Sequence, residues 1–306
     1  MRYLKSMKNT HLQHPEDSIL TGDLSALYWF SVDSDLSLKI DGAPAIVFGT
    51  NPANGKFFVG TKSVFNKVKI KINHSHEEID ANQTGEVAEI LHHCLDYLPR
   101  ISGIVQCDFV GYGGDDTFTP NTLTYIFDDI VDQRIIVAPH TRYIADSDLR
   151  DAVAYPDTST WVDSENVKYV KPDCWQVSKD LETSIAFARQ MSTLCEYLTP
   201  KQSARVQKQF NACIRNGVVI DDITLEALAF DNQCDVNTLR LWSLVKNIKD
   251  QMLRTCRNNG PKAYIGNKQC GGEGYVRTNK FGMFKLVNRE QFSHANFNNG
   301  RFSCAS

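Results

Sequence analysis

Short apolar and alternating runs dominate the first half of the chain and predict β-strands. The runs at 45–48 and 57–59 flank the turn cluster Asn-Pro-Ala-Asn-Gly and predict a hairpin. In KVKIKI, apolar residues and lysines alternate strictly, which predicts a strand with one buried face. Predicted strands therefore cover 45–48, 57–59, 67–72, 101–112, 123–130 and 134–138.

Helical periodicity appears once among these strands, at 82–98, and then dominates the chain after about residue 146. Thr199 and Pro200 are suited to the N-cap and first turn of a helix. Helices are predicted at 173–197, 199–217, 225–230 and 235–257, and strands at 262–265, 274–277 and 282–287.

These patterns predict an α+β protein with mainly antiparallel sheets, because only one helix separates many strands. We expect residues 1–35 to form an N-terminal lead-in with helical character. Residues 36–145 and 261–306 would then form one β-rich domain, and residues 146–260 an all-helical insertion.

Composition narrows the class of protein. The chain has 306 residues, 42% of them hydrophobic, and no apolar run of about 18 residues, so we expect no membrane span. The first residues lack the apolar core of a signal peptide, which favours a cytoplasmic location. Nine cysteines without a C-x-x-C pair argue against a zinc knuckle or a secreted disulfide framework.

Charge is nearly balanced overall, at −3, but it is unevenly distributed. Five lysines and no acid lie between 55 and 73, and eight basic residues and one acid lie between 254 and 289. If both stretches converge, they make a local anion-binding surface; otherwise they are solvated strand faces. A three-residue spacing of His11, His14 and Asp17 would permit a metal site, although we favour surface polar residues or a docking segment there.

The tetrapeptide KIDG, residues 39–42, is the strongest candidate for chemistry. Lys39 alternates with Leu38 and Ile40, so it points away from their apolar face, and Asp41 lies on its own side. Gly42 permits a turn or the close approach of a ligand. A lysine beside a carboxylate and a glycine is suited to covalent catalysis, and the alternative is an exposed strand lysine before a turn.

Four further segments follow KIDG in order: CDFVGY with Asp108, YIFDDI with Phe127, GEGYV with Glu273 and MFKLV with Lys285. In this order the segments resemble the motifs of the covalent nucleotidyltransferase superfamily, which comprises ATP-dependent RNA and DNA ligases and mRNA capping enzymes. KIDG resembles the nucleophile motif, GEGYV the EGxV motif and MFKLV the final lysine motif. In CDFVGY an aspartate stands where that family usually has glutamate. More loosely, THLQHPEDSIL, KIDGAPAIVFG and KFFVGTKSVFN resemble an uncharacterised family of tailed-phage proteins.

The resemblance implies a ligase-type fold, ATP and Mg²⁺ as cofactors, and a lysyl-AMP intermediate on Lys39. It assigns Lys62 and Lys285 to phosphate oxygens, with Lys285 also catalytic, and places Asp41 and Gly42 beside the nucleotide. Asp108 and Glu273 would bind Mg²⁺ or the ribose, and Phe127 would stack on the base.

An acceptor is implied as well: a nucleic-acid 5′-phosphate, held by a local basic surface. RNA ranks above DNA because YIFDDI resembles an RNA-ligase motif. Only 17 residues follow Arg289, too few for the oligonucleotide-binding barrel of DNA ligases and capping enzymes. Met283 and Ala43-Pro44 also depart from the usual motifs. Two alternatives remain. One is a non-catalytic phage protein in the host cytoplasm that binds nucleotide or nucleic acid. The other is a nucleotidyltransferase with another acceptor.

Overall fold

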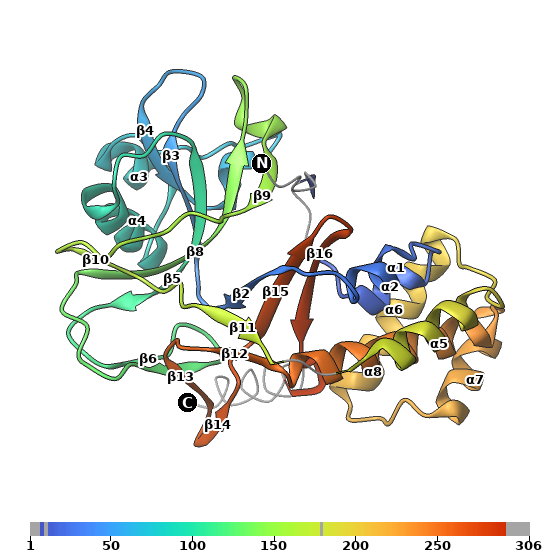
Figure 1. Ribbon diagram of the computed structural model, residues 1–306. Coiled ribbons are helices and arrows are strands. Elements are labelled where there is room, and N and C mark those ends of the chain that lie inside the picture. Colours follow the sequence, from blue (N-terminus) through green and yellow to red (C-terminus); the bar gives the residue numbers. More distant parts are fainter. Residues whose placement is uncertain (1–6, 9–11, 178–179, 292–306) are drawn as a thin grey trace, which may run out of the picture. The chain divides into compact units, whose positions relative to one another are not determined.

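The computed structural model describes residues 7–8, 12–177 and 180–291, which form two compact units (Figure 1). Unit 1 contains the described residues 7–8, 39–173 and 259–272. Unit 2 contains the described residues 12–38, 174–177, 180–258 and 273–291. Both units combine helical segments with antiparallel strand pairs, so the predicted α+β class is confirmed.

The main sheet of unit 1 is built on two long antiparallel strands, β5 and β8. In the described part of the chain its strand order is β1 (Met7–Lys8), β9 (Val153–Pro156), β8 (Ile135–Ile144), β5 (Ile104–Tyr112), β3 (Ala45–Thr50) and β4 (Phe57–Gly60). Strand β10 (Val167–Tyr169) pairs in parallel with β8. Strands β3 and β4 pair antiparallel, which confirms the predicted hairpin.

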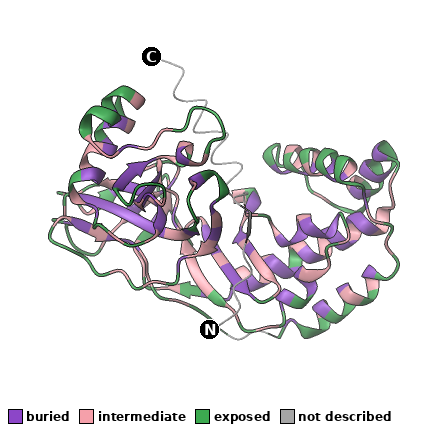
Figure 2. Ribbon diagram, turned by 90° about the horizontal axis from the view of Figure 1, so that it is seen from above, coloured by how far each residue is buried: buried purple, intermediate pink, exposed green. Residues whose placement is uncertain are grey.

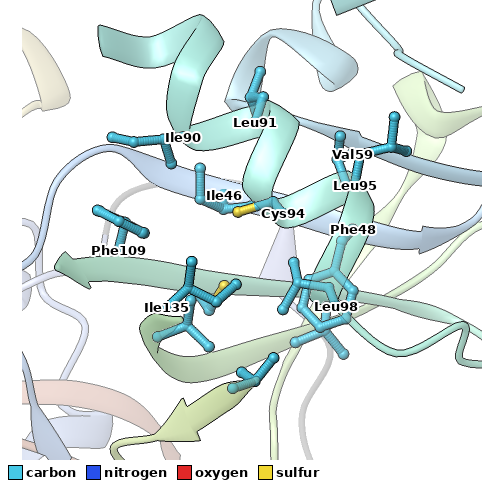
Figure 3. Close-up of a cluster of buried hydrophobic side chains, with 14 of the residues drawn as sticks. Ile46, Phe48, Val59, Ile90, Leu91, Cys94, Leu95, Leu98, Phe109 and Ile135 are labelled. Carbon is cyan, nitrogen blue, oxygen red and sulfur yellow. The ribbon is translucent and has the colours of Figure 1, made fainter. Parts of the chain in front are cut away.

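One face of this sheet is covered by α4 (Glu86–Tyr97), which follows α3 (His76–Asn82). Figure 3 shows Cys94 of α4 beside Ile46 of the sheet, and Leu91 and Phe109 belong to the same buried cluster. These side chains are buried, and burial of each Leu, Ile or Phe side chain contributes about 1.5–3 kcal/mol through the hydrophobic effect. The amphipathic helix predicted at 82–98 is therefore confirmed, with its start shifted to Glu86.

A smaller antiparallel sheet completes unit 1. In the described part its order is β14 (Lys268–Cys270), β13 (Lys262–Ile265), β7 (Thr124–Ile126) and β6 (Thr117–Phe118). The predicted strand at 123–130 is thus shorter than expected. Two 3₁₀ turns, η1 (Lys62–Phe65) and η2 (Leu149–Asp151), lie in connections.

The strand predicted at 67–72 is wrong. These residues form an irregular loop in which the Val68 side chain is 78% exposed and Lys69 has φ +58°. Only Asn73, just after the segment, forms an isolated bridge with Val59. Alternation predicts a strand only where a neighbouring strand supplies hydrogen-bond partners, and no described strand pairs with this segment.

Unit 2 is mainly helical and contains a small sheet, and Figure 2 shows buried and exposed faces along the helices of the chain. Its helices are α1 (Pro15–Ile19), α2 (Ser25–Trp29), α5 (Glu182–Ser192), α6 (Pro200–Arg215), α7 (Asp222–Asn232) and α8 (Val236–Leu253). Its strands are β2 (Asp35–Lys39), β11 (Cys174–Gln176), β12 (Cys256–Asn258), β15 (Gly274–Asn279) and β16 (Gly282–Val287). Lys39, the last residue of β2, is also the first residue of the segment 39–173 of unit 1.

The core of unit 2 joins α8 to α5, α2 and the β15–β16 hairpin. Phe210 of α6 stacks on Trp242 of α8, with ring centroids 3.8 Å apart. Thr199 forms the predicted N-cap of α6, and Asp235 caps α8.

The prediction that residues 146–260 are all helical is wrong over 146–181. Strands β9, β10 and β11 occupy parts of that range, and α5 begins only at Glu182. Three- and four-residue strands are too short to show a period, so only their pairing reveals them. The two units also divide the chain differently from the predicted segments, because residues 12–38 share unit 2 with α5–α8. The helical character expected in 1–35 is confirmed by α1 and α2.

None of the helices in the described ranges combines the length and the apolar character needed to cross a bilayer.

Candidate functional site

Lys39 ends strand β2. Leu36 and Leu38 of this strand pack against the core of unit 2, so alternation directs Lys39 to the opposite side of the strand from these two residues. The sequence-based orientation of Lys39 is thereby supported by packing.

Asp41 anchors a loop of unit 1. Its carboxylate accepts hydrogen bonds from Asn121 Nδ2 at 2.9 Å and from the backbone N–H groups of Thr122 and Leu123 at 2.9 and 3.2 Å. Its own N–H donates to the Tyr125 hydroxyl at 2.6 Å. These contacts join KIDG to the YIFDDI segment, and no local signal in the sequence pointed to Asn121 or Tyr125.

Gly42 lies directly against strand β5. A Cβ at this position would stand 2.6 Å from the Phe109 carbonyl oxygen and 2.8 Å from the Asp108 Cβ. Backbone hydrogen bonds continue the contact, since Ala43 N–H donates to the Phe109 carbonyl and Phe109 N–H donates to that of Pro44. The Ala43–Pro44 peptide bond is cis. KIDG and Asp108 are therefore neighbours, and only glycine fits between them.

Asp108 faces a histidine that the sequence analysis missed. Its Oδ1 lies 3.6 Å from His140 Nε2, and the two side chains are 18% and 35% exposed. His140 also hydrogen-bonds Thr141 Oγ1 through Nδ1, and Gln106 lies beside it. His140 is on β8, two residues beyond the predicted strand 134–138, so no local pattern indicated this pair.

Phe127 and Lys62 occupy different surroundings in unit 1. Phe127 follows β7 and packs edge-on against Phe118, with ring centroids 5.6 Å apart. Since Tyr125 is two residues earlier, Phe127 belongs to the segment that contacts Asp41. Lys62 is exposed at the start of η1.

Glu273 and Lys285 belong to unit 2. Glu273 directly precedes β15, and Lys285 is paired with Val276 across the antiparallel β15–β16 hairpin. Tyr275 and Leu286 point into the core, so Val276 and Lys285 lie on the other face of the hairpin. The strand order β16-β15-β2 places β2 beside the β15–β16 hairpin, although β2 and the hairpin lie more than two hundred positions apart in the sequence.

The expectation that His14 and Asp17 are surface residues is wrong. Their side chains are only 13% and 12% exposed, and the Asp17 carboxylate accepts hydrogen bonds from Trp242 and Arg289. His11, the third member of that spacing, lies outside the described residues. Across the described ranges, no group of three or more His, Cys, Asp or Glu side chains is arranged to hold a metal ion.

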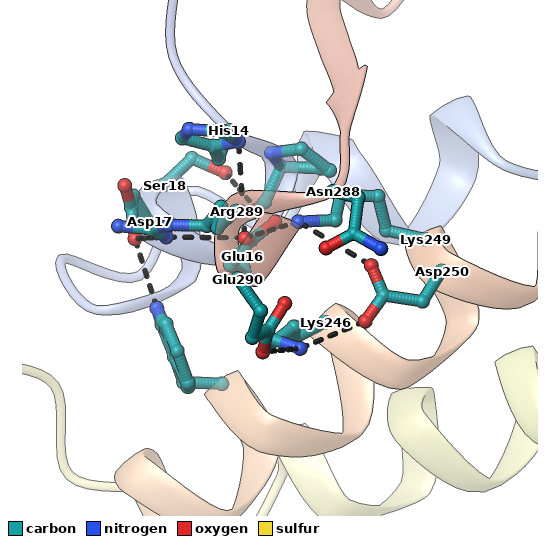
Figure 4. A network of polar contacts seen from close by, with 12 residues as sticks. His14, Glu16, Asp17, Ser18, Lys246, Lys249, Asp250, Asn288, Arg289 and Glu290 are labelled. Carbon is teal, nitrogen blue, oxygen red and sulfur yellow. Dashed lines mark hydrogen bonds and ion pairs between the residues drawn. The ribbon is translucent and has the colours of Figure 1, made fainter. Parts of the chain in front are cut away.

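Buried charges surround these residues (Figure 4). Glu16 is fully buried and binds Lys249 at 2.7 Å and Arg289 at 3.1 Å. Burial alone would raise the pKa of Glu16, but nearby positive charge, Lys249 foremost, lowers it to about 2. Burial lowers the pKa of His14 to about 2, so this imidazole is neutral at pH 7.

Fold and sites together define an α+β protein with antiparallel sheets in both units and a lysine-aspartate-glycine segment packed on the main sheet of unit 1. The chain belongs to the family of unknown function DUF6267, whose model matches residues 9–227 and 220–301. No curated protein and no solved structure matches the chain.

Proposed function

We propose that this protein is an ATP-dependent nucleotidyltransferase of the ligase type, with Lys39 as the covalent nucleophile. The main support for this proposal is the strand order β16-β15-β2, in which the strands that carry residues of MFKLV, GEGYV and KIDG lie side by side. The contact of Gly42 with Asp108 adds a second support, since it joins the KIDG and CDFVGY segments.

The first chemical step requires an unprotonated lysine. The lone pair of Lys39 Nζ attacks the α-phosphorus of ATP, the bond to the bridging oxygen of the β-phosphate breaks, and pyrophosphate leaves. Nζ gives up its proton, and a lysyl-AMP phosphoramidate remains. Because an ordinary lysine has a pKa of about 10.4, nearby positive charge is needed to favour the neutral amine, and Lys285 is proposed to supply it.

The other residues have proposed binding roles. Lys62 and Lys285 bind phosphate oxygens, Phe127 stacks on the base, and Gly42 leaves room for close approach. Asp108 and Glu273 are carboxylates of the kind that bind Mg²⁺, which neutralises phosphate charge when present. The Asp41 carboxylate already accepts three hydrogen bonds from residues 121–123, so its contribution to the nucleotide site is to hold this loop.

In the second step, an oxygen of a nucleic-acid 5′-phosphate attacks the phosphorus of the phosphoramidate. The P–N bond breaks, Nζ regains a proton, and AMP is joined to the acceptor through a new phosphoanhydride. RNA is proposed ahead of DNA as the acceptor. The exposed basic residues of 254–289, which exclude the buried Arg277 and Arg289, and the exposed lysines of 55–73 are proposed to contact it.

A labelling experiment tests the nucleophile. Purified protein is incubated with Mg²⁺ and ATP labelled on the α-phosphate, then denatured and separated on a gel. We expect label on the wild type and none on Lys39→Ala. Lys56→Ala, which removes an exposed lysine from the nearby hairpin, serves as the matched control and should keep its label.

Each outcome has a distinct meaning. Absence of label with ATP and GTP, or full label on Lys39→Ala, contradicts the proposal and favours a non-catalytic binding protein. Label on Lys39 that is not transferred to 5′-phosphorylated RNA or DNA retains the nucleotidyltransferase and rejects the nucleic-acid acceptor. Competition between ATP and GTP identifies the base.

A further inference from the structure

Two histidines and two aspartates form a crossed cluster between α3 and α4 in unit 1. Each helix supplies one histidine and, four residues later, one aspartate: His76 and Asp80 from α3, His92 and Asp96 from α4. Residues four apart share a helix face, so each pair is presented together to the other helix.

Each imidazole is held by the aspartate of the opposite helix. His76 Nε2 lies 3.0 Å from Asp96 Oδ1, and His92 Nε2 lies 2.9 Å from Asp80 Oδ1. A carboxylate accepts hydrogen bonds, so both Nε2 atoms carry protons. The ring planes differ by 22°, the ring centroids lie 4.9 Å apart, and the two Nδ1 atoms face each other at 2.7 Å.

This arrangement requires a cation between the rings. With Nε2 protonated, the Nδ1 of a neutral imidazole carries a lone pair, and two lone pairs at this separation repel. Either one proton or one metal ion removes the repulsion. A single proton leaves the cluster with one net negative charge, because two carboxylates are present, whereas a divalent ion neutralises it.

The carboxylate contacts favour the metal. A metal-bound histidine usually donates its second ring N–H to a carboxylate, which fixes the tautomer and increases the basicity of the ligating nitrogen. Here both histidines have that support, and both ligating nitrogens point to the same place.

We propose that His76 and His92 bind one divalent transition-metal ion through their Nδ1 atoms, with Asp96 and Asp80 as supporting partners. Imidazole ligands suit Zn²⁺, Ni²⁺ and Cu²⁺. Tetrahedral Zn²⁺ with Zn–N bonds of about 2.0–2.1 Å needs the two nitrogens about 3.3 Å apart, so the rings must separate by roughly 0.6 Å. The His76 and His92 side chains are 49% and 28% exposed, which leaves room for this movement and for water to complete the coordination. The bound ion links α3 to α4.

Calorimetric titration of tag-free, metal-stripped protein with Zn²⁺ and then Cu²⁺ tests the site. We expect one equivalent to bind, Cu²⁺ more tightly than Zn²⁺. His76→Ala and His92→Ala should each lose this binding. The matched control is His93→Ala on the same helix, whose ring instead stacks on Tyr97, and it should bind as the wild type does.

A second variant separates ligation from folding. Asp80→Asn combined with Asp96→Asn keeps both ligating rings and should weaken binding about 10–100-fold. Circular dichroism verifies that each variant is folded, and His76→Gln replaces any alanine variant that is not. The metal should raise the melting temperature of the wild type but not that of His76→Ala.

Three results would overturn the proposal: no saturable binding of Zn²⁺ or Cu²⁺ by the wild type, unchanged binding in His76→Ala and His92→Ala, or equal loss in His93→Ala. In the first case the two rings share a proton only.

Discussion

At the scale of single residues, the contact of KIDG with β5 depends on the absence of a side chain at Gly42. The nearest obstacles to a Cβ there are a backbone carbonyl oxygen of Phe109 and the Cβ of Asp108, neither of which can rotate away. Any larger residue must therefore displace the segment 41–45, which carries the loop anchor Asp41 and pairs with β5 at Ala45.

We expect Gly42→Ala to lower the free energy of unfolding by about 1–3 kcal/mol, the usual cost of overpacking. Gly271→Ala is the matched control in the same unit, because its added Cβ meets no atom within 4 Å. Urea denaturation followed by circular dichroism measures both. Equal free energies of unfolding for the two variants would show that the segment 41–45 shifts to accommodate the added Cβ without loss of stability.

At the scale of elements, a local capping signal predicted the start of α6. The hydroxyl of Thr199 accepts from the backbone N–H of Gln202, while the Gln202 side chain accepts from the N–H of Thr199. This reciprocal cap uses only residues within one turn, so it is visible in the sequence. The segment 67–72 shows the opposite case, since its alternation is strand-like but no described strand pairs with it.

Removing the cap of α6 should be measurable. We expect Thr199→Ala to cost about 1 kcal/mol of unfolding free energy, because a backbone N–H at the helix start loses its acceptor. Lys201→Ala changes an exposed residue in the same turn and should stay within about 0.5 kcal/mol of the wild type. A loss as large in Lys201→Ala would refute the capping explanation.

At the scale of the whole molecule, buried charges join distant parts of the chain within unit 2. Glu16 of α1 binds Lys249 of α8 and also Arg289, which follows β16 (Figure 4). His14 is buried beside Glu16, at 3.9 Å from Nδ1 to Oε1, and its Nδ1 has no hydrogen-bond partner among the described residues. Removing one partner from such a network lowers the free energy of unfolding by more than the intact network contributes to it, because a charge is left buried and unpaired.

The network predicts that the free energy of unfolding depends on pH. Burial lowers the pKa of His14 from 6.5 to about 2, so below pH 6.5 the unfolded chain takes up a proton that the folded chain excludes. The contribution of His14 to the free energy of unfolding is therefore fully present above pH 6.5. Below pH 6.5 this contribution falls by about 1.4 kcal/mol per pH unit. Glu16, with a pKa lowered from 4.5 to about 2, acts in the same direction only below pH 4.5. The raised pKa of Asp17, caused by burial, acts in the opposite direction.

Urea denaturation at pH 7.5 and pH 5.5 brackets the pH at which His14 of the unfolded chain takes up its proton. His14→Gln should lose less stability between these two pH values than the wild type does. An equal loss in both proteins would assign the pH dependence to other titrating groups.

Much of the fold could be predicted from the sequence because its signals are local. The hairpin at β3–β4, the amphipathic face of α4 and the cap of Thr199 depend on residues within a few positions of one another. The order of KIDG, GEGYV and MFKLV along the chain was also enough to formulate the hypothesis of a lysine nucleophile. Short strands such as β10 could not be predicted, since three residues carry no period.

The sequence by itself determined the α+β class and most element positions, and it supplied the prediction that Lys39 is a nucleophile. Only the tertiary structure decided that residues 12–38 complete the helical unit, that Gly42 lies against Asp108, and that His140 faces that aspartate. It also decided that His76 and His92 meet between two helices, with an aspartate behind each ring. The reason is physical: helix and turn signals depend on neighbours in the chain, whereas pairing, burial and the meeting of charged groups depend on residues that folding brings together.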